Sequence, residues 1–255
     1  MRVLSSFSPT PRAEAARAVA ELGTIMGVWA HPDDEAFLSA GLMRLALENG
    51  QRVVCVTATK GELGTSDPFV WPPDQLAPAR SVELAASLAA VADGLDNTIE
   101  HHWLDHRDGR CADIRPDIGT AQITGLINRV RPDTVVTFEP GGLTGHADQQ
   151  AVAQWTTDAT RQRPEILQLD AVITQSYVDH FDGHLDLDPF FDDGYPRPVD
   201  DAEVHLELVL DDELWHVKAQ ALRAQQTQTD ALIEMLGADL WKDFNIVEAF
   251  VAHHR

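Results

Sequence analysis

The stretch Thr24–Glu35, with the sequence TIMGVWAHPDDE, decides the interpretation of the whole chain. Its first seven residues form an apolar run, which predicts a buried strand over 24–30. A histidine, a proline and three acidic residues follow at once, and an apolar periodicity typical of a helix begins at about residue 36. A strand, a polar turn and a helix in this order are the opening of a βαβ unit.

Strand-like runs alternate with helical patterns along the rest of the chain. This alternation predicts an α/β fold that is Rossmann-like, with a mostly parallel sheet and helices on both faces. The predicted strands are 24–30, 52–58, 99–104, 134–138, 171–175 and 204–210. The predicted helices are 36–49, 79–92, 117–130, one from about 147, and 212–236. We expect a single domain, 1–255, with a less regular C-terminal third at about 176–255.

Two local patterns qualify this outline. The segment 61–78 carries two glycines and four prolines, so we expect an irregular loop that lies over a site ahead of the 79–92 helix. The 117–130 helix is expected to bury an apolar stripe, which consists of Ile118, Ile123, Leu126, Ile127 and Val130.

The charge balance limits the classes of partner. The formal net charge is -22, from 41 acidic and 19 basic residues, and such a field repels nucleic acids and anionic membranes. No apolar stretch approaches the roughly 18 residues of a membrane span, and the first 20 residues lack a signal-peptide pattern, so we expect a cytoplasmic protein. The acidic segment 179–212 is interpreted as a solvated loop, with a cation site as the alternative.

The two cysteines, Cys55 and Cys111, have no C-x-x-C spacing. We therefore interpret them as reduced structural thiols rather than as a disulfide or a zinc site.

The turn after the first predicted strand carries groups suited to metal-assisted hydrolysis. Zinc in a hydrolase takes nitrogen and oxygen ligands and keeps one position for water, and His31 with Asp34 supplies two such donors on one turn. Asp33 is the natural general base, because a carboxylate can take the proton of a metal-bound water. The alternative is that the acidic residues only cap the following helix, but this leaves His31 unexplained.

A second polar cluster, Thr144–Gln150, follows the 134–138 strand. In open sheets ligands bind at the carboxyl ends of the strands, so we expect both clusters at one edge. His146 would face a substrate carbonyl and Asp148 would orient its imidazole, a pair suited to stabilising an oxyanion or protonating a leaving amine. A surface histidine beside a capping aspartate is the alternative.

In this order, the motifs resemble the PIG-L/LmbE family of zinc-dependent N-deacetylases, which includes deacetylases of N-acetylglucosaminyl lipids and of mycothiol precursors. The resemblance covers most of the chain and also implies a Rossmann-like sheet. The matching stretches are 30–35, 59–62, 80–83, 104–109, 145–148 and 218–228.

The resemblance assigns roles to individual residues. It implies that His31 and Asp34 bind Zn²⁺ or another divalent metal, that Asp33 is the general base, and that His146 with Asp148 serves the transition state. The residues implied to lie near substrate hydroxyls or to shape the pocket wall are Arg80, Asp108 and Glu62.

The chain departs from the family pattern at two polar positions. Gln149 stands where the family has its third zinc ligand, a histidine, and Gln225 stands where relatives often have another histidine. An amide oxygen is a weaker zinc donor than imidazole, so the site would bind zinc less tightly, bind another metal, or bind none. Three further histidines are interpreted as exposed loop residues, with metal binding as the alternative: His101, His102 and His106.

Three alternative hypotheses about the function follow from these observations. The first is a metal-dependent hydrolase that removes an N-acetyl or other amide-linked acyl group from an amino-sugar-type or related small-molecule conjugate. The second is an inactive family member that binds a sugar-like ligand, and the third is a scaffold that keeps only the fold. The retained adjacent carboxylates favour chemistry, because Asp33 and Asp34 repel each other unless a cation or a proton is present.

The sequence leaves the substrate open and is compatible with a monomer or a homo-oligomer. Aromatic side chains in the loops are candidates for stacking on a sugar or for local packing: Trp71, His102, Trp103, Phe190, Phe191 and Tyr195.

Overall fold

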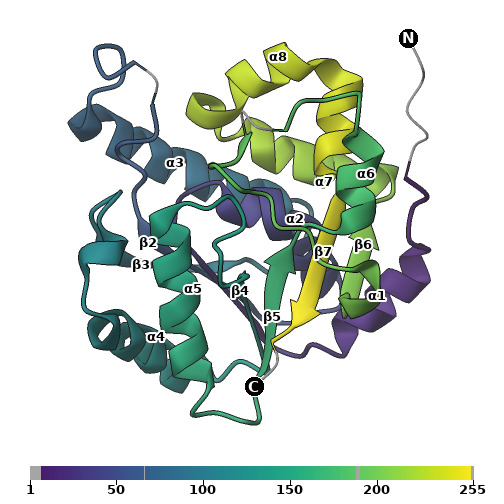
Figure 1. Ribbon diagram of the computed structural model, residues 1–255. Coiled ribbons are helices and arrows are strands. Elements are labelled where there is room, and N and C mark those ends of the chain that lie inside the picture. Colours follow the sequence, from purple (N-terminus) through teal and green to yellow (C-terminus); the bar gives the residue numbers. More distant parts are fainter. Residues whose placement is uncertain (1–6, 66, 188–189, 254–255) are drawn as a thin grey trace.

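The computed structural model describes residues 7–65, 67–187 and 190–253 (Figure 1). At the centre of this part of the chain lies a seven-stranded sheet in the order β3-β2-β1-β4-β5-β7-β6. The strands are β1 (Ile25–Trp29), β2 (Val53–Thr59), β3 (Glu100–His106), β4 (Thr134–Phe138), β5 (Leu167–Val172), β6 (Leu206–Val209) and β7 (Val247–Ala252). The strands β1 to β5 pair in parallel, and β7 is antiparallel to both β5 and β6. The predicted mostly parallel α/β sheet is confirmed.

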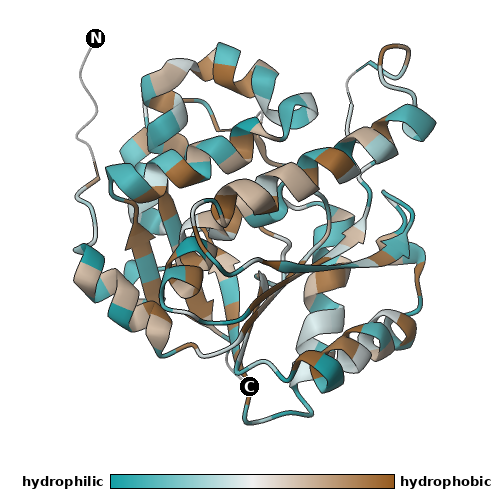
Figure 2. Ribbon diagram, turned by 180° about the vertical axis from the view of Figure 1, so that it is seen from behind, coloured by the Kyte–Doolittle hydropathy of each residue, from teal (hydrophilic) through white to brown (hydrophobic). Residues whose placement is uncertain are grey.

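Helices cover both faces of the sheet (Figure 1). They are α1 (Arg12–Ala20), α2 (Asp34–Glu48), α3 (Pro73–Val91), α4 (Pro116–Val130), α5 (Ala147–Thr160), α6 (Gln175–Phe181), α7 (Asp212–Arg223) and α8 (Gln226–Asn245). The helix α2 packs against α1, α3 and α7, whereas α4 packs against α5. In Figure 2 the outer helices carry hydrophobic and hydrophilic residues side by side, as expected for elements with one side on a core. No helix within the described ranges is long and apolar enough to cross a membrane.

The core lies where the sheet is covered on both faces. All residues of β1, β2 and β4 are buried, which is typical of parallel strands between two helical layers. Trp29 of β1 packs edge-on against Phe138 of β4, with 5.2 Å between ring centroids. Cys55 and Cys111 are both free and buried.

The strand order creates a crevice at one edge of the sheet. Although β1 and β4 are neighbours, the chain continues from β1 to β2 on one side and from β4 to β5 on the other. Loops that leave two adjacent strands in opposite directions open a crevice at their carboxyl ends, where ligands bind in folds of this kind. His31 follows β1 and the 139–146 segment follows β4, so both predicted clusters reach this crevice.

The helix α3 begins six residues earlier than predicted and shortens the expected loop. Pro72 is its N-cap, and Pro73 occupies the first helical position, where the helix needs no backbone N–H donor. Leu76 is fully buried, and its packing draws the segment into the helix although Pro78 lies inside it. A high content of proline therefore marked the start of a helix here.

The predicted 212–236 helix is two helices, α7 and α8, with a break at Gln225. Gln225 has φ -96° and ψ 50° and is fully buried, and its side chain donates to Glu35 Oε1 at 2.6 Å. The break between the helices therefore places the side-chain amide of Gln225 next to Glu35, below the crevice. Two smaller differences are that β5 begins at Leu167 and that Ile118, expected in the core, is 48% exposed.

Among the α-helices and strands of the described residues, two helices and one strand were not predicted: α1, α6 and β7. The strand β7 follows α8 without an intervening glycine or proline, so its sequence carries no turn signal.

Candidate active site

The turn after β1 is held by hydrogen bonds from its own backbone. Asp34 Oδ2 accepts from the amides of Ala30 at 3.1 Å and His31 at 2.8 Å. Asp33, the N-cap of α2, has φ 108°, which is unusual for a residue other than glycine, and its amide donates to Glu35 Oε2 at 3.0 Å. Such a conformation persists only where the surroundings fix it, and it is common at functional sites.

Arg80 fixes the Asp33 side chain. Its Nη2 lies 3.1 Å from Asp33 Oδ2 and also donates to the Pro32 carbonyl, while Nη1 donates to the Gly61 carbonyl at 2.8 Å. Burial raises the pKa of Asp33 to about 7, against the opposing effect of the Arg80 charge. A carboxyl group that titrates near neutral pH is well suited to exchange a proton with a reacting group.

Gly61 leaves the space that the Arg80 side chain fills. A Cβ at this position would lie 2.2 Å from Arg80 Nη1, and Gly61 has φ 63°. We expect Gly61→Ala to destabilise the fold by more than the roughly 1–2 kcal/mol that a left-handed alanine costs, because Arg80 must also move. Denaturant unfolding measures the loss. Gly50→Ala is the matched control, since Gly50 has φ 77° and nothing within 4 Å; equal losses in both variants would contradict the packing against Arg80.

His31 lies among three carboxylates. Its Nε2 is 3.1 Å from Asp108 Oδ1 and 3.4 Å from Asp148 Oδ2, and its Nδ1 is 3.7 Å from Asp34 Oδ2. Burial alone would lower the pKa of His31, but the hydrogen bonds to Asp108 and Asp148 raise it to about 10. Burial would also raise the pKa of Asp108, but the hydrogen bond to His31 lowers it to about 2. The polar groups therefore form one strongly coupled cluster.

Glu62 lies behind this cluster. Its Oε1 accepts from the backbone amide of Asp108 at 3.1 Å, and Asp108 Oδ2 accepts from the amide of Leu63 at 2.8 Å. Glu62 thus positions the segment that carries Asp108.

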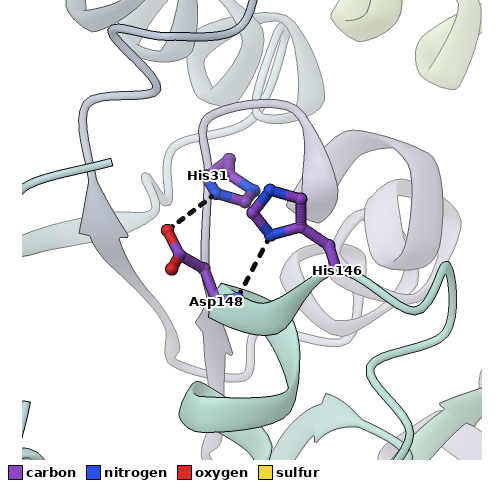
Figure 3. A group of neighbouring side chains, drawn as sticks. All are labelled: His31, His146 and Asp148. Carbon is purple, nitrogen blue, oxygen red and sulfur yellow. Dashed lines mark hydrogen bonds and ion pairs between the residues drawn. The ribbon is translucent and has the colours of Figure 1, made fainter. Parts of the chain in front are cut away.

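The second cluster meets the first across the crevice, as Figure 3 shows. The rings of His31 and His146 are edge-on, with centroids 4.7 Å apart. His146 is the N-cap of α5, and its Nδ1 accepts from the backbone amide of Asp148 at 3.1 Å. The Asp148 carboxylate, which is fully buried, accepts from the amides of Gly109 and Cys111 and lies beside His31. Asp148 therefore contacts His146 through its backbone and His31 through its side chain.

Gln149 is brought next to Asp34. Its Nε2 donates to Asp34 Oδ1 at 2.9 Å, and its Oε1 accepts from Thr144 Oγ1 at 2.8 Å. Both ends of the amide are engaged, and the end that faces Asp34 is the donor.

The chemistry of the donor set fits a divalent metal. Among the described residues, His31, His146 and Asp148 each offer a ligand atom, and these atoms lie within 4.8 Å of one another. Imidazole nitrogen and carboxylate oxygen are the ligands that catalytic zinc takes. Acidic side chains also outnumber basic ones in this cluster. Four aspartates pair with only two basic side chains, Arg80 and His31: Asp33, Asp34, Asp108 and Asp148.

Glu35 is a buried member of the site for which no catalytic or binding role was predicted. It is fully buried and accepts from Asp33 N, from Gln225 Nε2 and, at 3.2 Å, from Ser87 Oγ. Burial raises its pKa to about 8, and the neighbouring charge of Asp33 adds to this. Its position at the end of the polar turn 31–35 could have marked it as a site residue. Only the fold shows that its carboxylate accepts a hydrogen bond from the backbone amide of Asp33.

The three further histidines are not part of the site. They lie within β3 rather than in a loop. His101 Nε2 lies 3.1 Å from Thr57 Oγ1, and His106 Nε2 lies 2.7 Å from Gln122 Oε1. They are half-buried, so their interpretation as exposed loop residues was wrong.

A cavity of about 510 Å³ opens above the cluster. Seven of the predicted site residues line it: His31, Asp33, Asp34, Arg80, Asp108, His146 and Gln149. Phe190 and Phe191 line it as well, and the opposite wall is mostly apolar. The volume lies within the roughly 300–1,000 Å³ that is usual for small-molecule sites.

A parallel α/β sheet with an imidazole–carboxylate cluster at its carboxyl edge, beside a ligand-sized cavity, is an arrangement suited to binding a divalent metal and a small molecule. The sequence profile of the PIG-L family, described as GlcNAc-PI de-N-acetylase, matches residues 26–160. The chain belongs to the PIG-L family.

Two curated relatives carry the same name, 1D-myo-inositol 2-acetamido-2-deoxy-alpha-D-glucopyranoside deacetylase. The relative from Mycobacteroides abscessus is 31% identical over 242 residues, which cover 80% of this chain and 81% of the relative. The relative from Kineococcus radiotolerans is 33% identical over 163 residues, which cover 53% of this chain but only 44% of the relative.

A solved structure shares the fold at low sequence identity. The N,N'-diacetylchitobiose deacetylase from Pyrococcus horikoshii superposes with a TM-score of 0.64 at 18% identity, over 93% of this chain and 86% of that chain.

Proposed function

We propose that this chain is a zinc-dependent N-deacetylase that hydrolyses the acetamide of an amino-sugar-type conjugate. The observation that carries the proposal is the meeting of two polar clusters, from the ends of β1 and β4, at one cavity. Membership in a family of de-N-acetylases and relatives named as deacetylases of an acetamido sugar support the same reaction.

His31 and Asp34, whose Nδ1 and Oδ2 atoms lie 3.7 Å apart, would hold the metal in this proposal. His146 and Asp148, which offer ligand atoms near His31 as well, would instead serve the transition state. A divalent metal bound by His31 and Asp34 would supply a water of pKa about 7 and polarise the acyl oxygen. Asp33 takes the proton of the attacking water, and Arg80 keeps its carboxylate turned to the cavity through the 3.1 Å contact.

His146 acts on the other side of the scissile bond. Because its Nδ1 accepts the amide hydrogen of Asp148, the ring proton resides on Nε2. That N–H can donate a hydrogen bond to the developing oxyanion, while the proton that Asp33 takes from the water can pass on to the leaving amine. Asp148 thereby fixes the tautomer of His146 through its backbone. Arg80 and Asp108 would contact substrate hydroxyls, and Glu62 would position Asp108.

In this proposal, Gln149 lowers the affinity of the site for zinc. Its donor end faces Asp34, so Gln149→His would replace an N–H donor by an imidazole nitrogen and should tighten zinc binding by at least about tenfold. A zinc titration in competition with a chromophoric chelator measures the change. Gln150→His, one residue further along α5, is the control and should leave the affinity unchanged. Equal affinities of all three proteins would contradict the placement of residue 149 at the metal.

The engaged amide of Gln149 also favours a second candidate function, a family member that binds a sugar-like ligand without turnover. The two functions separate in one assay, in which the protein is incubated with methyl 2-acetamido-2-deoxy-glucoside and the primary amine is quantified. The deacetylase releases amine, loses this activity after chelation and regains it with zinc. A protein that binds the glycoside but releases no amine with zinc present is the non-catalytic member.

A further inference from the structure

We propose that Glu35 and Gln225 are positioning residues for the general base: together they hold Asp33 in the backbone conformation that turns its carboxylate to the cavity. Neither is among the described residues that line the cavity, so both act through Asp33 rather than on the substrate. The inference rests on the proposed deacetylase function and adds two residues to the machinery of the same site.

The backbone of Asp33 is strained. Its φ of 108° and ψ of -34° lie outside the sterically allowed left-handed region, at φ about 50–70° and ψ about 30–60°. The other described residues with positive φ that are not glycine have φ of 60° or less: Asp105, Arg131 and Leu143. Such a conformation persists only where neighbouring groups fix it, so the contacts of Asp33 must offset its strain.

The peptide unit that precedes the Asp33 Cα is held at both ends. Its carbonyl, from Pro32, accepts from Arg80 Nη2, and its N–H, from Asp33, donates to Glu35 Oε2 at 3.0 Å. The orientation of this peptide unit relative to the Asp33 Cα is the φ angle. Arg80 also contacts the Asp33 carboxylate, whereas the bond to Glu35 involves only the Asp33 backbone. Substitution of Glu35 therefore tests the backbone conformation by itself.

The start of α2 shows why this bond matters. An aspartate at an N-cap usually caps its own helix, because its side chain accepts from an amide of the first turn, but Asp33 makes no such bond. In a capping box an acidic side chain of the first turn also reaches back to the N-cap amide. Glu35 makes this second bond from the second helical position. The Asp33 carboxylate is thereby left for Arg80 and the cavity.

Glu35 is fixed in turn by two side chains from distant parts of the chain. Its Oε1 accepts from Gln225 Nε2 at 2.6 Å and from Ser87 Oγ at 3.2 Å, and all three residues are fully buried. Gln225 stands at the break between α7 and α8, and α7 packs against both α2 and α3. Both oxygens of the buried carboxylate have donors, so the network keeps Glu35 in one orientation.

The other end of the Gln225 amide is without a partner. Its Oε1 is buried and has no hydrogen bond within the described part of the chain, so the side chain bonds to Glu35 alone. This free acceptor makes Glu35→Gln a conservative variant. The new amide keeps an oxygen for the Asp33 N–H and can donate to Gln225 Oε1 once the Gln225 amide turns over.

Glu35→Met removes the acceptor and keeps the length of the side chain. We expect kcat of the zinc-loaded protein to fall by about 10–100-fold, because a catalytic group displaced by about 1 Å loses that much. KM should change by less than about twofold. The affinity for zinc should be unchanged, since Asp34 is held by the amides of Ala30 and His31. Glu35→Gln should keep kcat within about threefold of the unaltered protein.

The same substitution in the Asp33→Asn protein separates positioning from a general effect on the fold. If Glu35 acts only by placing the Asp33 carboxylate, Glu35→Met lowers the rate of the unaltered protein but does not lower that of Asp33→Asn any further. A merely structural role lowers the rate in both backgrounds. Equal fold losses in the two backgrounds therefore overturn the proposal.

Gln225→Met tests the second residue and keeps the test decisive if Glu35→Met does not fold. It should lower kcat by at least about threefold, because Glu35 loses its shortest hydrogen bond. Gln168→Met is the matched control: Gln168 is also buried, its Nε2 also donates to a buried carboxylate, Asp170 Oδ1 at 2.7 Å, and it does not line the cavity. Its kcat should be unchanged. Equal kcat values in the two variants overturn the role of Gln225.

Exchange of the Asp33 amide hydrogen, followed by NMR on isotope-labelled protein, reports the same contact without turnover. Glu35→Met should raise the exchange rate at least about tenfold, because the amide loses its acceptor, whereas Glu35→Gln should retain it. This result supports the positioning role even if no protein releases amine, in which case the deacetylase proposal alone fails. An unchanged exchange rate in Glu35→Met overturns the positioning role, whatever the rates of amine release.

Discussion

Replacement of Asp33 by asparagine is expected to lower the rate of amine release by about 10²–10⁴-fold, the usual contribution of a general base. The amide cannot take the proton of the attacking water, but it keeps the size of the side chain and tolerates φ 108° better than most residues. Steady-state kinetics on the zinc-loaded protein gives the loss, and metal analysis should show unchanged zinc content.

Asp105→Asn is the matched control for this variant. Asp105 also has a positive φ, 60°, but its side chain is 65% exposed and pairs with Lys60 away from the cavity. Its rate should equal that of the unaltered protein. An Asp33→Asn protein with full activity would show that another group accepts the proton.

The second large effect concerns the fold that carries the site. Lys218 and Glu248 are fully buried and form an ion pair at 2.9 Å. Lys218 Nζ also donates to the Phe37 carbonyl, and Glu248 accepts from the amides of Gly41 and Leu42, so the pair joins α7 and β7 to the middle of α2. Lys218→Met leaves the Glu248 carboxylate buried without its cation, and such a loss costs about 3–5 kcal/mol. Urea unfolding followed by circular dichroism measures it.

Two further variants test the cause of this loss. Removal of both charges in Lys218→Met/Glu248→Leu should lose less stability than Lys218→Met alone, because no unpaired charge stays buried. Lys242→Met removes an exposed pair with Asp212 and should leave the unfolding midpoint unchanged. A double variant less stable than the single one would contradict the desolvation argument.

The architecture could be predicted because its signals are local. The runs that became β1, β2 and β4 are continuously apolar, and each is followed by a helical periodicity, so the parallel sheet follows from sequence pattern. The antiparallel strand β7 could not be predicted in this way. Its place between β5 and β6 depends on pairing with strands far away in sequence, and no turn residue marks its start.

The membership of the site could be predicted better than its internal geometry. Strand order brings the turn after β1 and the segment after β4 to the same crevice, and that order follows from the βαβ pattern. The contacts that Asp148 makes with the two histidines could not be predicted. They depend on the backbone amides of Gly109 and Cys111, which donate to the Asp148 carboxylate and so fix its orientation. The burial of Gln225 under Glu35 likewise depends on a break between two helices that a periodic pattern conceals.

Whether the chain is a zinc-dependent deacetylase is tested by stepwise addition of zinc to metal-free protein, with amine release from an N-acetylated glucosamine derivative measured at each step. We expect no release without metal, a rate that rises with zinc, and a break at one zinc per chain for a centre at His31 and Asp34. A rate that does not depend on zinc, or no amine at any zinc concentration, would contradict it.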